Sequence, residues 1–255
     1  MPPSALAAQL YTVRDQVQTP AAIAKSCARV KKMGYDAVEV SALGPIETAE
    51  LARILDGEGL VCAATHVSVE LMRDVGACVA YHETLKCLYP AIGGAAELYQ
   101  QPTLETYRLF ARQYSQIAAA LSPHGLKVGY HNHSHELARF GGYIGLDVLL
   151  EEADAAVWFE IDTYWIAHGG GDPAAWIEKA AGRVPCLHLK DMAITADRQQ
   201  LMCEVGDGNL NWPRILQACR AAGVQWYIVE RDEGELDAFD SLQRSWENLK
   251  GMGVG

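Results

Sequence analysis

The sequence is poor in positive charge. It has 21 lysines and arginines against 32 aspartates and glutamates, which gives a formal net charge of −11 over 255 residues. A chain of this kind lacks the basic surface that binds a nucleic-acid backbone or an anionic membrane. We therefore expect no nucleic-acid or membrane partner, and we expect a small molecule as the substrate.

Paired cysteines and long apolar runs are also lacking. The seven cysteines are an odd number, widely spaced and without a CxxC pair, which argues against a disulfide framework in a chain of this length. No run approaches the roughly 18–20 apolar residues of a membrane span. The first residues lack the basic and apolar regions of a secretory signal. We expect a cytoplasmic protein with reduced cysteines.

Loops that cradle phosphates are missing as well. There is no GxGxxG motif after an expected strand and no GxxxxGK[ST] motif, so no nucleotide site is indicated. No linker or low-complexity tract divides the chain. Half of the residues are hydrophobic, which is enough for one large core. We expect residues 1–255 to form one catalytic domain.

What the chain does have is a regular alternation of short apolar runs with longer stretches of helical periodicity, typical of βα units and a parallel sheet. The expected strands are residues 5–10, 36–40, 61–66, 87–92, 127–131, 157–162, 184–189 and 226–230. The expected helices are residues 21–33, 46–56, 72–85, 104–122, 144–153, 173–180, 212–222 and 237–249. Eight units fit an α/β fold with a single (β/α)8 TIM barrel better than an open sheet. Pro90 makes the fourth strand the weakest prediction, because proline removes one ladder donor.

Ionisable side chains recur where the expected strands end, which is the face that carries the active site of such barrels. Examples are His66, Asp162, His188 and Glu230. A buried charge is costly unless it is paired or binds a metal. Carboxylates and imidazoles together suit one divalent ion, with Mn²⁺ first and Mg²⁺, Co²⁺, Zn²⁺ or Fe²⁺ as alternatives.

The expected metal ligands are Glu136, Asp162, His188 and Glu230. The ligand from the fifth strand is not decided by the sequence. His131 lies nearer the expected strand end than Glu136 and could take its place. His133 is the expected general base, since an imidazole titrates near neutral pH.

Other polar residues are expected to contact the substrate. Lys190 is expected to stabilise a developing oxyanion or contact the substrate. The predicted substrate-facing wall consists of Gln9, Glu39, His66, His131 and Trp165. Trp165 offers an apolar face to a sugar ring, although packing alone also explains it. A structural hydrogen-bonding role is the alternative for His66.

Several segments carry a family resemblance. They are residues 9–15, 34–40, 130–136, 160–165, 182–191, 205–212 and 227–232, and they span most of the chain. In these segments the chain resembles the xylose isomerase-like TIM-barrel superfamily, in the branch of sugar phosphate isomerases/epimerases and inosose dehydratase-like proteins. The resemblance implies a divalent metal bound from the last four strands, with direct transfer to Asp162, His188 and Glu230.

The fifth-strand segment departs from the simpler epimerase pattern, in which a glutamate follows the strand at once. Its His-Asn-His-x-x-Glu arrangement, residues 131–136, looks more like the branch of cyclitol dehydratases and enzymes of 3-keto sugars. The resemblance implies a metal-dependent sugar or sugar phosphate isomerase/epimerase that acts through an enediolate. A lyase, dehydratase or hydrolase of inososes or 3-keto sugars stays open. An abasic-site endonuclease is disfavoured by the net charge. Barrels of this family often associate, so a homo-oligomer is a further expectation.

Overall fold

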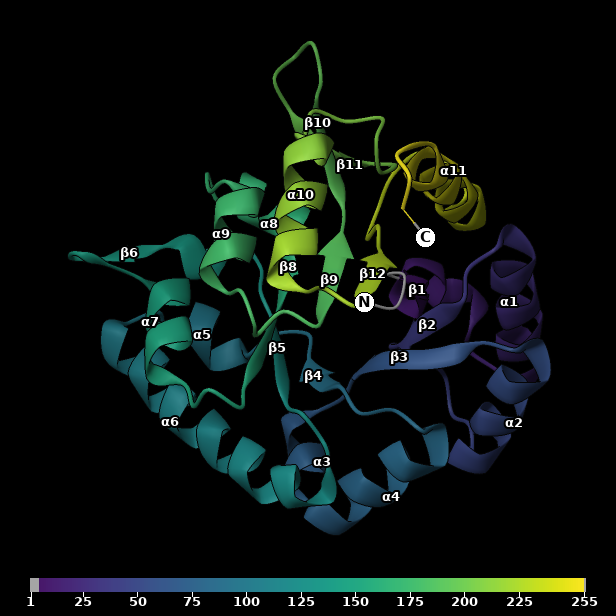
Figure 1. Ribbon diagram of the computed structural model, residues 1–255, viewed down its shortest axis with the longest axis horizontal. Helices are drawn as coiled ribbons and strands as arrows, with labels where there is room; N and C mark the ends of the chain where they lie inside the picture. The colour runs from purple at the N-terminus through teal and green to yellow at the C-terminus, as the bar shows by residue number, and fades with distance from the viewer. Residues whose placement is uncertain (1–4, 255) are drawn as a thin grey trace.

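Eight parallel strands close into a barrel in the computed structural model, which describes residues 5–254 (Figure 1). Around the barrel the order is β1-β12-β9-β8-β5-β4-β3-β2. The strands are β1 (Ala5–Gln9), β2 (Ala37–Val40), β3 (Val61–His66), β4 (Pro90–Ile92), β5 (Gly129–His131), β8 (Trp158–Asp162), β9 (Cys186–Leu189) and β12 (Trp226–Val229). Each lies within its predicted range, so the predicted (β/α)8 barrel is confirmed.

The helices surround the barrel (Figure 1). They are α1 (Pro20–Met33), α2 (Thr48–Glu58), α3 (Val69–Arg73), α4 (Val75–Leu85), α5 (Ala96–Gln100), α6 (Leu104–Leu121), α7 (Gly145–Glu152), α8 (Thr163–His168), α9 (Pro173–Lys179), α10 (Trp212–Ala222) and α11 (Ala238–Gly251). In α6, Tyr107, Phe110, Tyr114 and Leu121 are buried at helical spacing, so one face of the helix covers the barrel. Within residues 5–254, no helix is long and apolar enough to cross a membrane.

The fourth strand is shorter than predicted. Residues 87–92 were expected to be extended, but β4 begins only at Pro90, whose missing N–H is tolerated at the first position of a strand. The residues before it still join the sheet irregularly, because Thr65 N–H donates to the carbonyl of Tyr89 and Lys127 N–H donates to that of Leu88. The proline thus shortens the strand without opening the barrel.

Two antiparallel hairpins, which the periodicity did not predict, follow the carboxyl ends of barrel strands. β6 (Arg139–Phe140) pairs with β7 (Tyr143–Ile144) after β5, and β10 (Asp191–Ile194) pairs with β11 (Gln200–Cys203) after β9. The loop that joins β10 and β11 projects from the body of the protein (Figure 1). Both hairpins therefore add to the face of the barrel on which the strands end.

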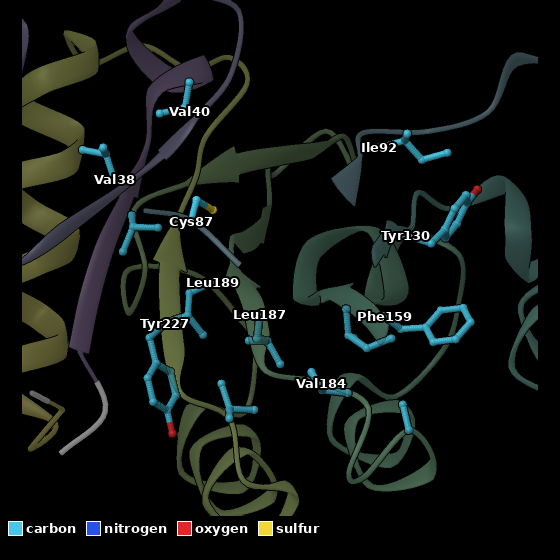
Figure 2. Close-up of a cluster of buried hydrophobic side chains, with 14 of the residues drawn as sticks. Val38, Val40, Cys87, Ile92, Tyr130, Phe159, Val184, Leu187, Leu189 and Tyr227 are labelled. Atoms are coloured by element: carbon cyan, nitrogen blue, oxygen red, sulfur yellow. The ribbon is translucent and has the colours of Figure 1, made fainter. Parts of the chain in front are cut away.

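Alternation along the strands separates the apolar core from the polar interior of the barrel. Tyr130, Phe159 and Leu187 belong to the large core cluster between strands and helices (Figure 2). Their chain neighbours His131, Glu160 and His188 are the buried polar side chains of the same strands, and successive side chains of a strand point to opposite faces. The polar neighbours therefore face the barrel interior. A second, smaller apolar cluster, which contains several alanines and Trp158, is also buried there.

Candidate active site

Four side chains from the ends of four successive barrel strands converge. His131 (β5), Asp162 (β8), His188 (β9) and Glu230, which follows β12, each offer a ligand atom, and these atoms lie within 4.8 Å of one another. His188 Nδ1 is 3.0 Å from Glu230 Oε2 and 3.7 Å from Asp162 Oδ2. Two imidazoles and two carboxylates form a mixed nitrogen and oxygen donor set suited to a divalent ion. We call these four residues the ligand group.

Unsatisfied buried atoms test whether the ligand group fits a cation. His131 Nδ1 and Asp162 Oδ2 are buried without a hydrogen-bond partner among residues 5–254, although Glu160 Oε2 lies 3.8 Å from the first atom and Lys190 Nζ lies 3.5 Å from the second. The other oxygen of Asp162 accepts a hydrogen bond of 2.9 Å from Trp165 N–H at the start of α8. This cap fixes the carboxylate and leaves Oδ2 to face the group. Because buried polar atoms are rarely left unpaired, the donor set fits a cation.

A second group of possible ligands shares two members with the first. It consists of His66, His131, Glu160 and His188. Here, however, protein hydrogen bonds already join the side chains: His66 Nε2 is 2.7 Å from Glu160 Oε2, and His188 Nε2 is 2.6 Å from Glu39 Oε2. Filling both groups would require shared imidazoles to bridge two ions. The geometry therefore supports one ion, in the ligand group.

Glu136 is not brought together with Asp162, His188 and Glu230. The short helix η3 (His135–Leu137) turns the chain, and Glu136 lies with His133 and His135 instead. Its Oε1 accepts a 2.6 Å hydrogen bond from the Tyr130 hydroxyl, and its Oε2 accepts one of 2.9 Å from His133 N–H. Burial raises the pKa of Glu136 to about 7. The geometry favours His131, the alternative left open by the sequence, as the fifth-strand ligand.

A cavity of about 220 Å³ opens beside the ligand group. Its described lining is Tyr11, Ser41, His66, Gly93, His131, His133, Trp165, Lys190, Glu230 and Asp232. Three predicted wall residues, both predicted catalytic residues and two members of the ligand group are in this set. A larger cavity of about 390 Å³, near Lys127 and Gln225, is lined by none of these residues. The smaller cavity is therefore the candidate substrate site.

Gln9 and Glu39, also predicted for the substrate wall, do not line the cavity. Both are fully buried, and Gln9 Nε2 donates a 2.6 Å hydrogen bond to Glu39 Oε2, the oxygen that also contacts His188. Gln9 is the last residue of β1 and Glu39 is the last but one of β2, and the two joined side chains contact His188 through Glu39. The structure thus places them behind His188.

Lys190 is completely buried and surrounded by carboxylates. Its Nζ lies 2.8 Å from Glu230 Oε2, 2.8 Å from Asp232 Oδ1 and 3.5 Å from Asp162 Oδ2. Burial opposes the charge, but Glu230, Asp162 and Asp232 outweigh it and raise the pKa of Lys190, which stays an ammonium. The ammonium also lies 5.4 Å from the centre of the Trp165 ring.

Asp232 and Glu160 are the two acidic residues of the site that the sequence prediction missed. Asp232 lines the cavity, and burial together with the charge of Glu230 raises its pKa to about 6. Glu160 is buried and belongs to the second group of possible ligands. Glu160 lies two residues before Asp162 in β8, so the two-residue period of a strand was the signal that could have found it. Asp232 follows the end of β12, and its place two residues after Glu230 was the only signal.

His133 lies at the cavity as a neutral base. Burial lowers its pKa to about 4, so the imidazole is uncharged at neutral pH. Its ring centre is 4.9 Å from that of His131 and 5.3 Å from that of Trp165. His133 Nδ1 is buried without a hydrogen-bond partner in the described part of the chain. The arrangement provides a proton acceptor next to the ligand group.

Known proteins share this architecture. "Rhizopine catabolism protein MocC" of Rhizobium meliloti is 24% identical over 88% of this chain and 79% of its own length. A sugar phosphate isomerase/epimerase from Parabacteroides distasonis superposes with a TM-score of 0.81 at 21% identity, covering 98% of this chain and 94% of the other. A D-allulose 3-epimerase from a Methylomonas species gives 0.72 at 15% identity, covering 98% of each chain.

The family model described as "Xylose isomerase-like TIM barrel" matches residues 27–250. This range contains every member of the ligand group and seven of the eight barrel strands. The chain therefore belongs to the xylose isomerase-like TIM-barrel family.

Proposed function

We propose that the protein is a divalent-metal-dependent isomerase or epimerase of a carbohydrate-like carbonyl compound, which acts through an enediolate. The observation that carries the proposal is the neutral His133 imidazole, whose Nδ1 has no hydrogen-bond partner within residues 5–254, at a cavity that His131 and Glu230 of the ligand group also line. A base next to a site for a cation is the combination that proton abstraction beside a carbonyl requires.

The ion would be held by His131, Asp162, His188 and Glu230, and the mixed donor set suits Mn²⁺. When bound, such an ion supplies Lewis-acid polarisation of a carbonyl and stabilises negative charge on oxygen.

The protein's own residues supply the proton transfer and the orientation of the substrate. His133 removes the proton from the carbon beside the carbonyl and, in an isomerisation, returns it to the neighbouring carbon. An epimerisation takes its proton from a second donor on the other face of the substrate, and His133 keeps the proton that it removed. The Lys190 ammonium stabilises negative charge that develops on oxygen. Trp165 packs against the sugar ring, and its buried Nε1–H, unpartnered within residues 5–254, is a donor for a substrate hydroxyl. Together they bind and orient an uncharged polyhydroxy ketone.

The charges around the cavity favour an unphosphorylated substrate. Lys190 is the only lysine or arginine in the described lining, and three carboxylates already surround it. Two of these carboxylates, Glu230 and Asp232, belong to the lining itself. The three carboxylates together balance Lys190 and a divalent ion, which leaves no net positive charge to bind a phosphate. We therefore propose a neutral ketose or cyclitol ketone.

A dehydratase is the second candidate, and Asp232 is the observation that favours it. Burial and the charge of Glu230 raise its pKa to about 6, so the Asp232 carboxylate at the cavity can take up a proton near neutral pH and pass it to a departing β-hydroxyl. The similarity to a protein named for rhizopine catabolism is compatible with a cyclitol-like substrate. The two candidates share the enediolate and differ in whether water leaves.

Incubation in D₂O followed by NMR distinguishes the two reactions. The protein, loaded with Mn²⁺ for turnover and then freed of it for the spectra, is tested with neutral ketoses, inososes and the phosphorylated counterparts of the ketoses. Deuterium uptake without loss of water supports the isomerase, and an enone product supports the dehydratase. His133→Gln should abolish exchange, whereas His124→Gln, at an exposed histidine outside the cavity, should not. Full exchange by His133→Gln, or turnover of phosphorylated ketoses alone, would contradict the proposal.

A further inference from the structure

We propose that Glu39, held by Gln9, is a positioning residue that keeps the proton of His188 on Nε2 and turns the Nδ1 lone pair toward the metal site. This inference rests on the metal site of the proposed function. It assigns to two buried residues a role in metal binding although neither is a ligand or contacts the cavity.

The hydrogen bonds around Glu39 have a fixed direction. Tyr11 N–H donates to Gln9 Oε1 at 3.1 Å, which identifies that atom as the amide oxygen. The amide nitrogen of Gln9 therefore points to Glu39 and donates to its Oε2 at 2.6 Å. Since a carboxylate oxygen that already accepts one bond can accept another, Glu39 Oε2 is arranged to receive a second donor.

His188 supplies that second donor. Its Nε2 lies 2.6 Å from Glu39 Oε2, and both side chains are completely buried. A carboxylate accepts but does not donate, so Nε2 carries a proton. In the neutral ring the other nitrogen, Nδ1, then carries only a lone pair.

That lone pair faces two more acceptors. Nδ1 is 3.0 Å from Glu230 Oε2 and 3.7 Å from Asp162 Oδ2. Acceptor atoms held this close in a buried site repel one another unless a positive charge lies between them. The Lys190 ammonium contacts the same two oxygens, at 2.8 and 3.5 Å, but the 3.0 Å contact between Nδ1 and Glu230 Oε2 still joins two lone pairs. Either a second proton on Nδ1 makes His188 an imidazolium, or a metal ion takes the place of that proton. Glu39 thus selects the nitrogen at which proton and metal compete.

Glu39 does this without occupying the metal site. Its carboxylate is in neither group of residues that could hold an ion within residues 5–254. Metal-binding histidines commonly donate their other N–H to a carboxylate, which fixes the ring and makes it a stronger ligand. The inward position of Glu39 on β2, opposite Gln9 on β1, provides such a partner for a histidine three strands away around the barrel.

Metal affinity of Glu39→Gln tests the proposal, with Glu47→Gln as the control at an exposed glutamate. The amide keeps an acceptor for His188 but removes the charge. We expect Mn²⁺ titrated by calorimetry to bind wild type and control equally, at one ion per chain. Glu39→Gln should bind about 10–100-fold more weakly, the usual effect of losing such a partner. Wild-type affinity in Glu39→Gln would overturn the inference while leaving the metal site standing.

A second measurement needs no variant of Glu39. Wild-type protein labelled with ¹⁵N is loaded with ¹¹³Cd²⁺, and the His188 signals are assigned by their loss in His188→Gln. Coupling between ¹¹³Cd and Nδ1, with a proton retained on Nε2, supports the inference, and coupling through Nε2 overturns it. If Glu39→Gln fails to fold, the nitrogen to which ¹¹³Cd couples in the wild type is the result that tests the inference. If the wild type binds neither Mn²⁺ nor Cd²⁺, the proposed function fails, and this inference fails with it.

Discussion

Asp191 should anchor the loop that follows the β10–β11 hairpin. It is completely buried, and five donors surround its carboxylate. The main-chain N–H groups of Met192 and Leu210 donate to Oδ1 at 2.8 and 3.3 Å. Those of Gly206 and Gly208, with the indole N–H of Trp212, donate to Oδ2 at 2.9, 3.2 and 2.5 Å. One side chain therefore holds most of the loop against β10.

Asp191→Asn replaces one of these oxygens with an NH₂ group. If the amide oxygen takes the place of Oδ2 and keeps its three donors, the NH₂ group takes the place of Oδ1. The N–H groups of Met192 and Leu210 then face another donor instead of an acceptor. A hydrogen bond to a charged group contributes about 1.5–3 kcal/mol, so two lost bonds, one of them long, cost about 3 kcal/mol. For a chain of this size that corresponds to a fall in Tm of about 6–12 °C.

Thermal unfolding followed by circular dichroism measures the effect. The matched control is Asp36→Asn, at an exposed aspartate with no described side-chain hydrogen bond, and its Tm should equal that of the wild type. A loss below about 1 kcal/mol in Asp191→Asn would refute the account, because two buried donors cannot lose a charged acceptor at so small a cost.

Three further outcomes are expected. Burial raises the pKa of Glu136 to about 7, so the folded state keeps a proton that the unfolded state releases near pH 4.3. The free energy of unfolding, measured with urea, should therefore fall by up to about 3 kcal/mol from pH 4 to pH 8. This fall should be missing in Glu136→Gln. Gly129→Ala should lower stability by about 1–3 kcal/mol in the same assay, since the new Cβ would lie 2.1 Å from Trp158 Cε2. Lys190→Met should destabilise the metal-free protein by about 3–5 kcal/mol, because it removes the cation beside Glu230, and Mn²⁺ should restore part of the loss in Tm.

Periodicity was sufficient to predict the barrel but not its additions. All eight strands were predicted because each is an apolar run that must be buried on both faces. The two hairpins were missed because β6 and β7 have two residues each, and β10 is mostly only partly buried, so neither produces a strong alternating pattern. β4 begins only at Pro90, and the missing N–H of proline was the reason for which the sequence made this strand the weakest prediction.

The site was predictable to the extent that strand position determines it. Asp162 and His188 lie in the last residues of buried strands and Glu230 directly follows one, and the structure brings the three together. Glu136 was predicted to join these three residues, but the turn after β5 and the hydroxyl of Tyr130 direct its carboxylate away from them. The position of Glu39 behind His188 depends on pairing across the barrel, which no local pattern contains.

The most direct test of the account is the metal content of four proteins after incubation with Mn²⁺ and removal of free ions. The wild type and Glu136→Gln should each retain about one ion per chain, whereas His131→Gln and Asp162→Ala should retain little. A wild type that holds no divalent ion would contradict the central claim. Retention by His131→Gln with loss in Glu136→Gln would show that the ion is held by a different set of residues.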